Sequence, residues 1–171
     1  EKGDLVMLSW RFRGNRTANP ESDFAFDPET GTIFDYTGAS DDVRIPAAIG
    51  GRPVICIGKK ALQFKRIRSV VIPSGVVSIG DFAFADNNLE RVVIPENVAR
   101  IGAWAFSYNR LKNVIVLRPA VFFDEHVFTG NGEPTPAELT ISGYAGSNAA
   151  LYAVRNRHRF EPLGRLSTAT G

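Results

Sequence analysis

The side chains best suited to nucleophilic or acid–base chemistry are few in this chain of 171 residues: one cysteine, Cys56, and two histidines, His126 and His158. A Cys–His nucleophile pair needs both residues in one cleft together with a third group that orients the base. The sequence offers no such set, and His158 lies in the basic stretch RNRHRF, which is typical of a solvated surface. We therefore expect neither enzyme activity nor a cofactor.

Metal, phosphate and nucleic-acid motifs are equally weak. The oxygens of DPETGT (27–32) do not follow the spacing of a twelve-residue calcium loop, so a hairpin turn is the better interpretation. The Gly50-Gly51 pair lacks the strand–loop–helix setting of a phosphate cradle. A single cysteine excludes an internal disulfide and a thiolate metal cage. With a net charge of +2, no strong field attracts nucleic acid, and the basic cluster has no interleaved exposed aromatics. That cluster comprises Lys59, Lys60, Lys65, Arg66 and Arg68.

The dominant pattern is a sequence repeat, of which two similar copies follow one another directly. VVIPSGVVSIGDFAFADNNL starts at Val70, and VVIPENVARIGAWAFSYNRL starts 22 residues later at Val92. The columns with this period include Leu62, Phe84, Phe106 and Phe128; Val70, Val92 and Val114; and Asn87, Asn109 and Asn131. A unit this short cannot bury its own apolar face, so neighbours must stack into a solenoid. Degenerate units around Val43 and Leu139 extend it to about five turns.

Each unit predicts the same local structure. V-x-I-P alternates with the period of a strand, and the proline ends the strand because it cannot donate into a ladder. The I-G-x-x-A-F segment favours a short helical or 3₁₀ turn, with its glycine permitting a tight corner. The asparagine column is suited to bonding the neighbouring turn's backbone; Lys65 takes this place in the first unit. Cys56 shares a column with Ser78 and Arg100, and His126 replaces the aromatics of its own column.

The pattern I-P-x-x-V-x-x-I-G-x-x-A-F-x-x-N-x-L-x-x-V-x-I resembles the bacterial BspA-like, or treponemal, class of leucine-rich repeats. The first segment, TGTIFDYTGASDDVRIPAAIGGRPVICIG, and the closing segment, ISGYAGSNAALYAVRNRHRFEPL, are similar to those of the same proteins. The resemblance covers roughly residues 24–163. It implies an α/β repeat solenoid with a parallel concave sheet and short turns on the convex side. It also implies an exported protein of the bacterial surface or periplasm, often an adhesin.

The two ends of the solenoid require caps, because open sheet edges invite pairing with other chains. We predict an N-terminal segment and hairpin cap over residues 1–42, the solenoid over 43–142, a helical C-terminal cap over 143–163 and a flexible tail over 164–171. Ser147 is the expected N-cap of a helix from Asn148 to about Arg157. Its face of Ala150, Leu151 and Val154 would cover the last turn.

The middle residue of each V-x-I-P strand should point to the concave, solvent face. These residues are Arg44, Val71, Val93, Ile115 and Thr140, with a flanking polar row of Asp42, Ser69, Arg91, Asn113 and Glu138. The next row, Pro46, Pro73, Pro95 and Leu117, would extend the apolar surface. An apolar centre with a polar rim is the anatomy of an interaction patch. The predicted partner-binding residues are Val71, Val93, Ile115, Pro73, Pro95, Leu117, Arg91 and Asn113.

Four occupants of this patch remain open. The first hypothesis is a non-enzymatic interaction module that binds a protein partner, which the resemblance extends to a host matrix protein. Self-association into a homo-oligomer and binding of a small apolar ligand or lipid are the alternatives. The chain's own LVMLSWRF stretch (5–12) could instead cover the patch, or strand propensity alone could explain its residues. No apolar run reaches the roughly 18 residues that span a bilayer, and the chain opens with Glu1 rather than Met, which favours a mature or trimmed chain.

Overall fold

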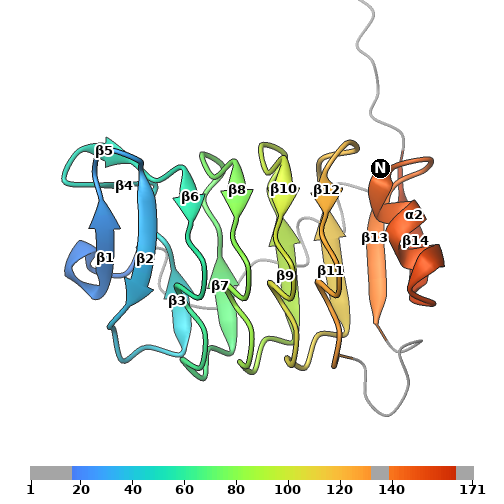
Figure 1. Ribbon diagram of the computed structural model, residues 1–171, viewed down its shortest axis with the longest axis horizontal. Helices are drawn as coiled ribbons and strands as arrows, with labels where there is room; N and C mark the ends of the chain where they lie inside the picture. Colours follow the sequence, from blue (N-terminus) through green and yellow to red (C-terminus); the bar gives the residue numbers. More distant parts are fainter. Residues whose placement is uncertain (1–16, 132–138, 165–171) are drawn as a thin grey trace, which may run out of the picture.

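The computed structural model describes residues 17–131 and 139–164. Two rows of short strands run along the solenoid (Figure 1). One row, which we call the repeat sheet, is formed by the strands of the V-x-I-P units and two strands that follow them. Its members are β3 (Asp42–Arg44), β7 (Ser69–Val71), β9 (Arg91–Ile94), β11 (Asn113–Val116), β13 (Thr140–Tyr144) and β14 (Arg159–Leu163). Its ladders, β3–β7 and β9–β11–β13–β14, are parallel, and β7 lies beside β9 (Figure 1).

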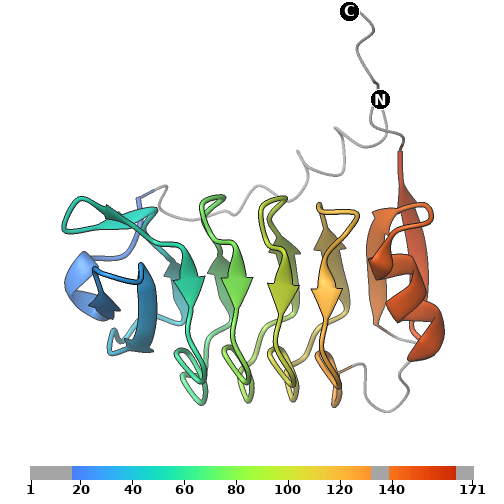
Figure 2. The ribbon, with the colours of Figure 1, turned by 45° about the horizontal axis from the view of Figure 1, so that its top comes forward.

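The other row, the second sheet, is formed by β1 (Phe24–Asp27), β2 (Thr32–Tyr36), β6 (Cys56–Ile57), β8 (Ser78–Ile79), β10 (Arg100–Ile101) and β12 (Phe122–Phe123). The sequence pattern assigned the Ile of I-G to the start of a helical turn, and this assignment is wrong: Ile57, Ile79 and Ile101 end two-residue parallel strands. The segments that follow are turns, which lie side by side along one edge of the solenoid (Figure 2).

The glycine of I-G serves a different purpose from the predicted one. Gly58, Gly80 and Gly102 are not among the positive-φ residues; instead, a Cβ on Gly80 would lie 2.7 Å from Lys59 N, and one on Gly102 would lie 2.6 Å from Asp81 N. Glycine is therefore required because the backbones of successive turns approach closely. The left-handed corners fall two residues later, on Lys60 (φ 62°) and Phe82 (φ 57°) and their equivalents in the next turns.

The core is built from columns of identical positions. Leu62, Phe84, Phe106 and Phe128 are each 0% exposed, with ring centroids 5.0 Å apart for Phe84–Phe106 and 5.7 Å apart for Phe106–Phe128. The predicted asparagine corners are present: Asn109 Nδ2 donates to the Phe84 carbonyl of the preceding turn at 2.9 Å, and its Oδ1 accepts from Leu89 N at 3.0 Å. Each turn is thus bonded to its neighbour at a buried corner.

Caps close both ends as expected, although the residues doing so differ in part. β1 and β2 form the antiparallel hairpin, and β2 pairs with β6; η1 (Glu21–Asp23) precedes the hairpin. The short strands β4 (Ala48–Ile49) and β5 (Arg52–Pro53) form a second antiparallel hairpin in the chain between β3 and β6.

At the other end, Ser147 caps α2 (Asn148–Arg155) by accepting from Ala150 N at 3.3 Å. The predicted packing face of this helix is wrong. Ala149, Tyr152 and Ala153 are buried, whereas Leu151 is 53% and Val154 is 74% exposed. Tyr152 contacts the rings of Phe123 and Phe128, with centroids 4.7 and 5.7 Å away. The helix therefore packs against the last repeat through the side that carries Tyr152. The predicted tail falls mostly on residues 165–171, which lie outside the described part of the chain.

Candidate partner-binding surface

The predicted binding residues lie on three neighbouring strands, β7, β9 and β11, or, for Pro73, Pro95 and Leu117, just after their ends. Parallel pairing places Arg91 opposite Asn113 and Val93 opposite Ile115. The residues between them in sequence, Val92 and Val114, belong to the core. Because side chains alternate across a strand, Val93 and Ile115 point away from the core, as predicted. We call this side of the repeat sheet its outer face.

Exposure on the outer face departs from the expectation of an open apolar centre. Val71 and Val93 are half-buried, while Ile115 is only 2% exposed. Among the flanking proline and leucine positions, Pro73 and Leu117 are half-buried and Pro95 is buried; in the polar row, Arg91 is exposed and Asn113 is half-buried. The prediction of solvent exposure is therefore wrong for Ile115 and Pro95.

The register of the late unit also corrects the row assignments. Thr140 pairs with Asn113, and Ser142 pairs with Ile115, so Ser142 rather than Thr140 continues the central row. β14 adds Arg159 opposite Thr140 and Glu161 opposite Ser142. The shift is two residues, which leaves every side chain on its predicted face because the side-chain period of a strand is two. Hydrophobic pattern alone does not distinguish the two alignments.

The large apolar side chains that are most exposed lie elsewhere among the described residues. Phe34, Ile55, Val77 and Phe122 belong to the second sheet or its approaches, Phe64 and Tyr108 lie at the turns, and Leu151 and Val154 lie on α2. Arg100 covers part of the second sheet, because its guanidinium lies 5.5 Å from the Phe122 ring centroid and its Nη2 is 2.8 Å from Asp124 Oδ2. The repeat pattern placed Arg100 in one column with Cys56 and Ser78 but did not predict these contacts.

The left-handed corners carry a stacked column. Lys60 Nζ lies 6.0 Å from the Phe82 ring centroid, Phe82 and Trp104 stack with centroids 6.3 Å apart, and Trp104 and His126 stack at 4.6 Å. His126 is thus a ring replacement in a structural column. His158, expected on a solvated surface, is half-buried and stacks on Tyr152.

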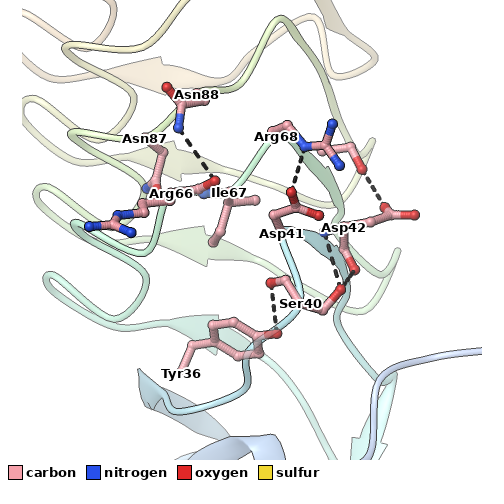
Figure 3. Close-up of polar contacts among 10 residues, drawn as sticks. Tyr36, Ser40, Asp41, Asp42, Arg66, Ile67, Arg68, Asn87 and Asn88 are labelled. Carbon is pink, nitrogen blue, oxygen red and sulfur yellow. Dashed lines mark hydrogen bonds and ion pairs between the residues drawn. The ribbon is translucent and has the colours of Figure 1, made fainter.

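Polar contacts link the loops at the N-terminal end of the repeat sheet (Figure 3). The Tyr36 hydroxyl donates to the Ser40 carbonyl at 3.1 Å, and Arg68 Nε donates to Asp41 Oδ2 at 2.6 Å. The Ser69 hydroxyl donates to the Asp42 carboxylate. The hydrogen bond from Arg68 is the main cause that lowers the pKa of Asp41, and burial raises the pKa of Tyr36.

The remaining residues considered for catalysis or metal binding, Cys56 and Asp27, make structural hydrogen bonds. Cys56 Sγ accepts a hydrogen bond from the Ser78 hydroxyl in the next turn at 3.1 Å. Asp27 accepts from Glu29 N and the Thr30 hydroxyl, which forms the hairpin turn predicted for DPETGT and lowers the pKa of Asp27. In residues 17–131 and 139–164, no cluster of three His, Cys, Asp or Glu side chains is placed to hold a metal. Within those same ranges, no helix is long and apolar enough to cross a membrane.

Stacked turns, two sheets whose repeat strands pair in parallel, and asparagine corners define a leucine-rich repeat solenoid. Residues 42–141 match the family described as "BspA type Leucine rich repeat region", in six copies. The chain belongs to this family, as the repeat pattern predicted, with one copy more than the sequence count. Repeats of this family are typically non-enzymatic, protein-binding scaffolds of exported bacterial proteins.

A solved structure supports the fold. The chain is similar to a leucine-rich repeat protein of T. pallidum (TpLRR), with 21% identity and a TM-score of 0.52 over 74% of this chain and 71% of that chain. No curated protein matches the chain.

Proposed function

We propose that this chain is an exported, adhesin-like protein of the bacterial surface or periplasm that binds a protein partner, with a host matrix protein as the first candidate. Its binding surface is the outer face of the repeat sheet. Partner specificity depends on side chains at the surface, since fold similarity does not transfer a partner. The chain acts as a scaffold rather than as an enzyme.

One observation supports this surface. In the β9–β11 ladder, an apolar pair of side chains lies beside a polar pair on the outer face. Val93 and Ile115 form one cross-strand pair, and Arg91 and Asn113 form the pair beside it. Arg91 is exposed, and Val93 retains part of its surface in solvent. Buried apolar anchors beside arginine and polar rim residues are typical of binding hot spots.

The test is surface plasmon resonance of the full chain over immobilised host matrix proteins. Val93→Glu places a charge in the apolar row, so we expect binding to weaken at least about tenfold, as for loss of a hot-spot contact. Val77→Glu is the matched control, because Val77 is 42% exposed and precedes β8 on the second sheet. Equal loss in both variants, or no binding to any matrix protein, would contradict the proposal.

Light scattering across protein concentration separates a foreign partner from a second copy of the chain. A monomer in both the wild type and Val93→Glu fits the proposal. A multimer that Val93→Glu dissociates would instead assign the outer face to self-association.

A further inference from the structure

We propose that the exposed side of α2 docks on the surface of a membrane that contains anionic lipid. The contact is made by two aliphatic side chains, Leu151 and Val154, and two cationic ones, Arg155 and Arg157. The outer face of the repeat sheet takes no part in this contact, so the inference does not depend on the proposed protein partner.

The first reason is that α2 is apolar on both of its sides. Ala149, Tyr152 and Ala153 are buried against the rest of the protein, whereas Leu151 is 53% and Val154 is 74% exposed. Residues three apart lie on the same face of a helix, so these two side chains form one apolar stripe. The outer side of a surface helix normally carries polar residues. Val154 is instead the most exposed of the large apolar side chains among the described residues.

The charged groups beside this stripe are cationic. Arg155 follows Val154 directly, Arg157 and Arg159 lie just after the helix, and all three arginines are exposed. Glu161 is the only acidic residue of the C-terminal cap, and its carboxylate pairs with Arg159 at 3.1 Å. Within the part of the chain that the structure describes, Arg155 and Arg157 form no ion pair. Their guanidinium groups are therefore available to an anionic ligand.

This combination of groups fits a lipid surface. Aliphatic side chains with arginines beside them are typical of helices that lie in the membrane interface, where the apolar groups enter the boundary of the acyl chains. The arginines keep their charged heads at the level of the phosphates. The dipole of α2 favours cations at its C-terminal end, but it does not account for the exposure of Leu151 and Val154. A fluid surface accepts a protruding stripe without a complementary groove.

The distribution of charge along the solenoid orients the protein on such a surface. α2 lies at one end of the solenoid, and the β1–β2 hairpin lies at the other (Figure 1). Residues 17–44, at the hairpin end, carry seven acidic side chains and one basic one. An anionic surface repels this end and attracts the arginines of the C-terminal cap. The two ends therefore favour the same orientation, with α2 toward the lipid.

Co-sedimentation of the full chain with lipid vesicles tests the inference. We expect binding to vesicles of equal parts phosphatidylglycerol and phosphatidylcholine, little binding to phosphatidylcholine alone, and weaker binding as salt is added. Arg155→Gln with Arg157→Gln should lower the partition coefficient roughly fivefold for each arginine. Leu151→Gln with Val154→Gln, which keeps the net charge, should lower it at least about tenfold, because the apolar contribution is lost.

Each double variant has a matched control on another part of the protein. Arg52→Gln with Arg66→Gln removes two exposed arginines, of which Arg66 has the same φ of 60° as Arg157. Ile55→Gln with Val77→Gln removes two aliphatic side chains that are 37% and 42% exposed beside the second sheet. Both controls should bind within about twofold of the wild type, because charges beyond a Debye length from the lipid are largely screened. Thermal unfolding checks that every variant is folded.

Three outcomes overturn the inference. The first is the absence of binding to the anionic vesicles, or an equal loss in the α2 variants and their controls. The second is binding to soluble polyglutamate but not to vesicles, which would assign the arginines to an acidic polypeptide. The third is a dimer, seen by light scattering in the absence of vesicle binding, that Leu151→Gln with Val154→Gln dissociates. That result would assign the stripe to a second copy of the chain.

Discussion

The interior turns and the first turn contact the preceding part of the chain through different side chains at the same repeat position. In the interior, Asn87 Nδ2 donates to the Leu62 carbonyl of the preceding turn at 2.7 Å, and Asn87 is only 6% exposed. In the first turn the equivalent position is Lys65, whose Nζ lies 2.8 Å from Asp35 Oδ1. Leu62 precedes Val70 by eight residues and Asp35 precedes Val43 by eight, so both contacts join equivalent positions of successive turns.

The difference follows from what surrounds each corner. An interior corner is enclosed by turns on both sides, so its backbone groups must be satisfied inside the protein. The first corner faces the β1–β2 hairpin, where the side chains of Lys65 and Asp35 are 29% and 45% exposed. Water can solvate this corner, and an ion pair is sufficient there. The comparison predicts large losses for interior substitutions and small ones at the first turn.

The largest expected loss comes from the stacked phenylalanine column. Phe106→Ala removes a ring that is 0% exposed and stacked between two others, which should lower the free energy of unfolding by about 4 kcal/mol. Phe64→Ala, in the first turn, is the matched control: Phe64 is 69% exposed, so the change should stay within about 0.5 kcal/mol. Urea unfolding measures both, and similar losses would remove the distinction between the two regions.

The interior asparagine corner should be the next most sensitive. Asn109→Ala leaves the buried Leu89 N without its acceptor and removes one of two asparagine donors from the Phe84 and Phe106 carbonyls, which keep their bonds from Asn87 and Asn131. Since an unsatisfied buried group costs roughly 1–3 kcal/mol, we expect a loss of about 2 kcal/mol in urea unfolding. A loss below that of Lys65→Ala would show that the corner is solvated after all.

At the first corner, Lys65→Ala removes a partly exposed ion pair. We expect the free energy of unfolding to fall by at most about 1 kcal/mol, because solvent screens such pairs. The effect should shrink further as salt is added. Thermal unfolding of wild type and variant at low and high salt checks this, and a large, salt-independent loss would place Lys65 in a buried network like that of Asn109.

The smallest effect concerns acid stability at the N-terminal end. Hydrogen bonding from Arg68 lowers the pKa of Asp41 below its ordinary value of 3.8. A lowered carboxyl pKa favours the folded state above the unfolded value, and this contribution disappears as pH falls through the folded value. Arg68→Ala should therefore lose slightly less stability than the wild type when the pH falls from neutral to below 3.8. Urea unfolding across this range tests the prediction; identical pH profiles would contradict it.

The sequence was sufficient for the architecture because the 22-residue period is carried by side chains whose roles are local. The Asn109 corner, the Phe106 column and the Ser147 cap each follow from residue type and spacing. The second sheet was missed because strands such as β8, Ser78–Ile79, contain two residues, too few to display a period. The reason for Gly80 was missed because close approach of two backbones is a property of the stacked turns, not of one turn.

The candidate surface was only partly predictable. Alternation along the strand correctly separates Val93 from Val92, but it does not give the exposed fraction of an outward-facing residue. Ile115 is the example: its type and place match those of Val93, yet it is only 2% exposed. The pairing of Thr140 with Asn113 depends on ladder geometry after an irregular unit, which spacing alone leaves ambiguous by two residues.

Identical ladders on both sides of an interior turn have a consequence for the length of the molecule. Arg100 pairs with Ser78 on one side and with Phe122 on the other, so a turn meets its two neighbours through equivalent backbone positions. A duplicated 22-residue unit inserted after Leu111 would find matching partners above and below, while both caps keep their own contacts. The solenoid can therefore be lengthened by whole turns inserted between its two caps, and each turn adds roughly 4.8 Å to its length.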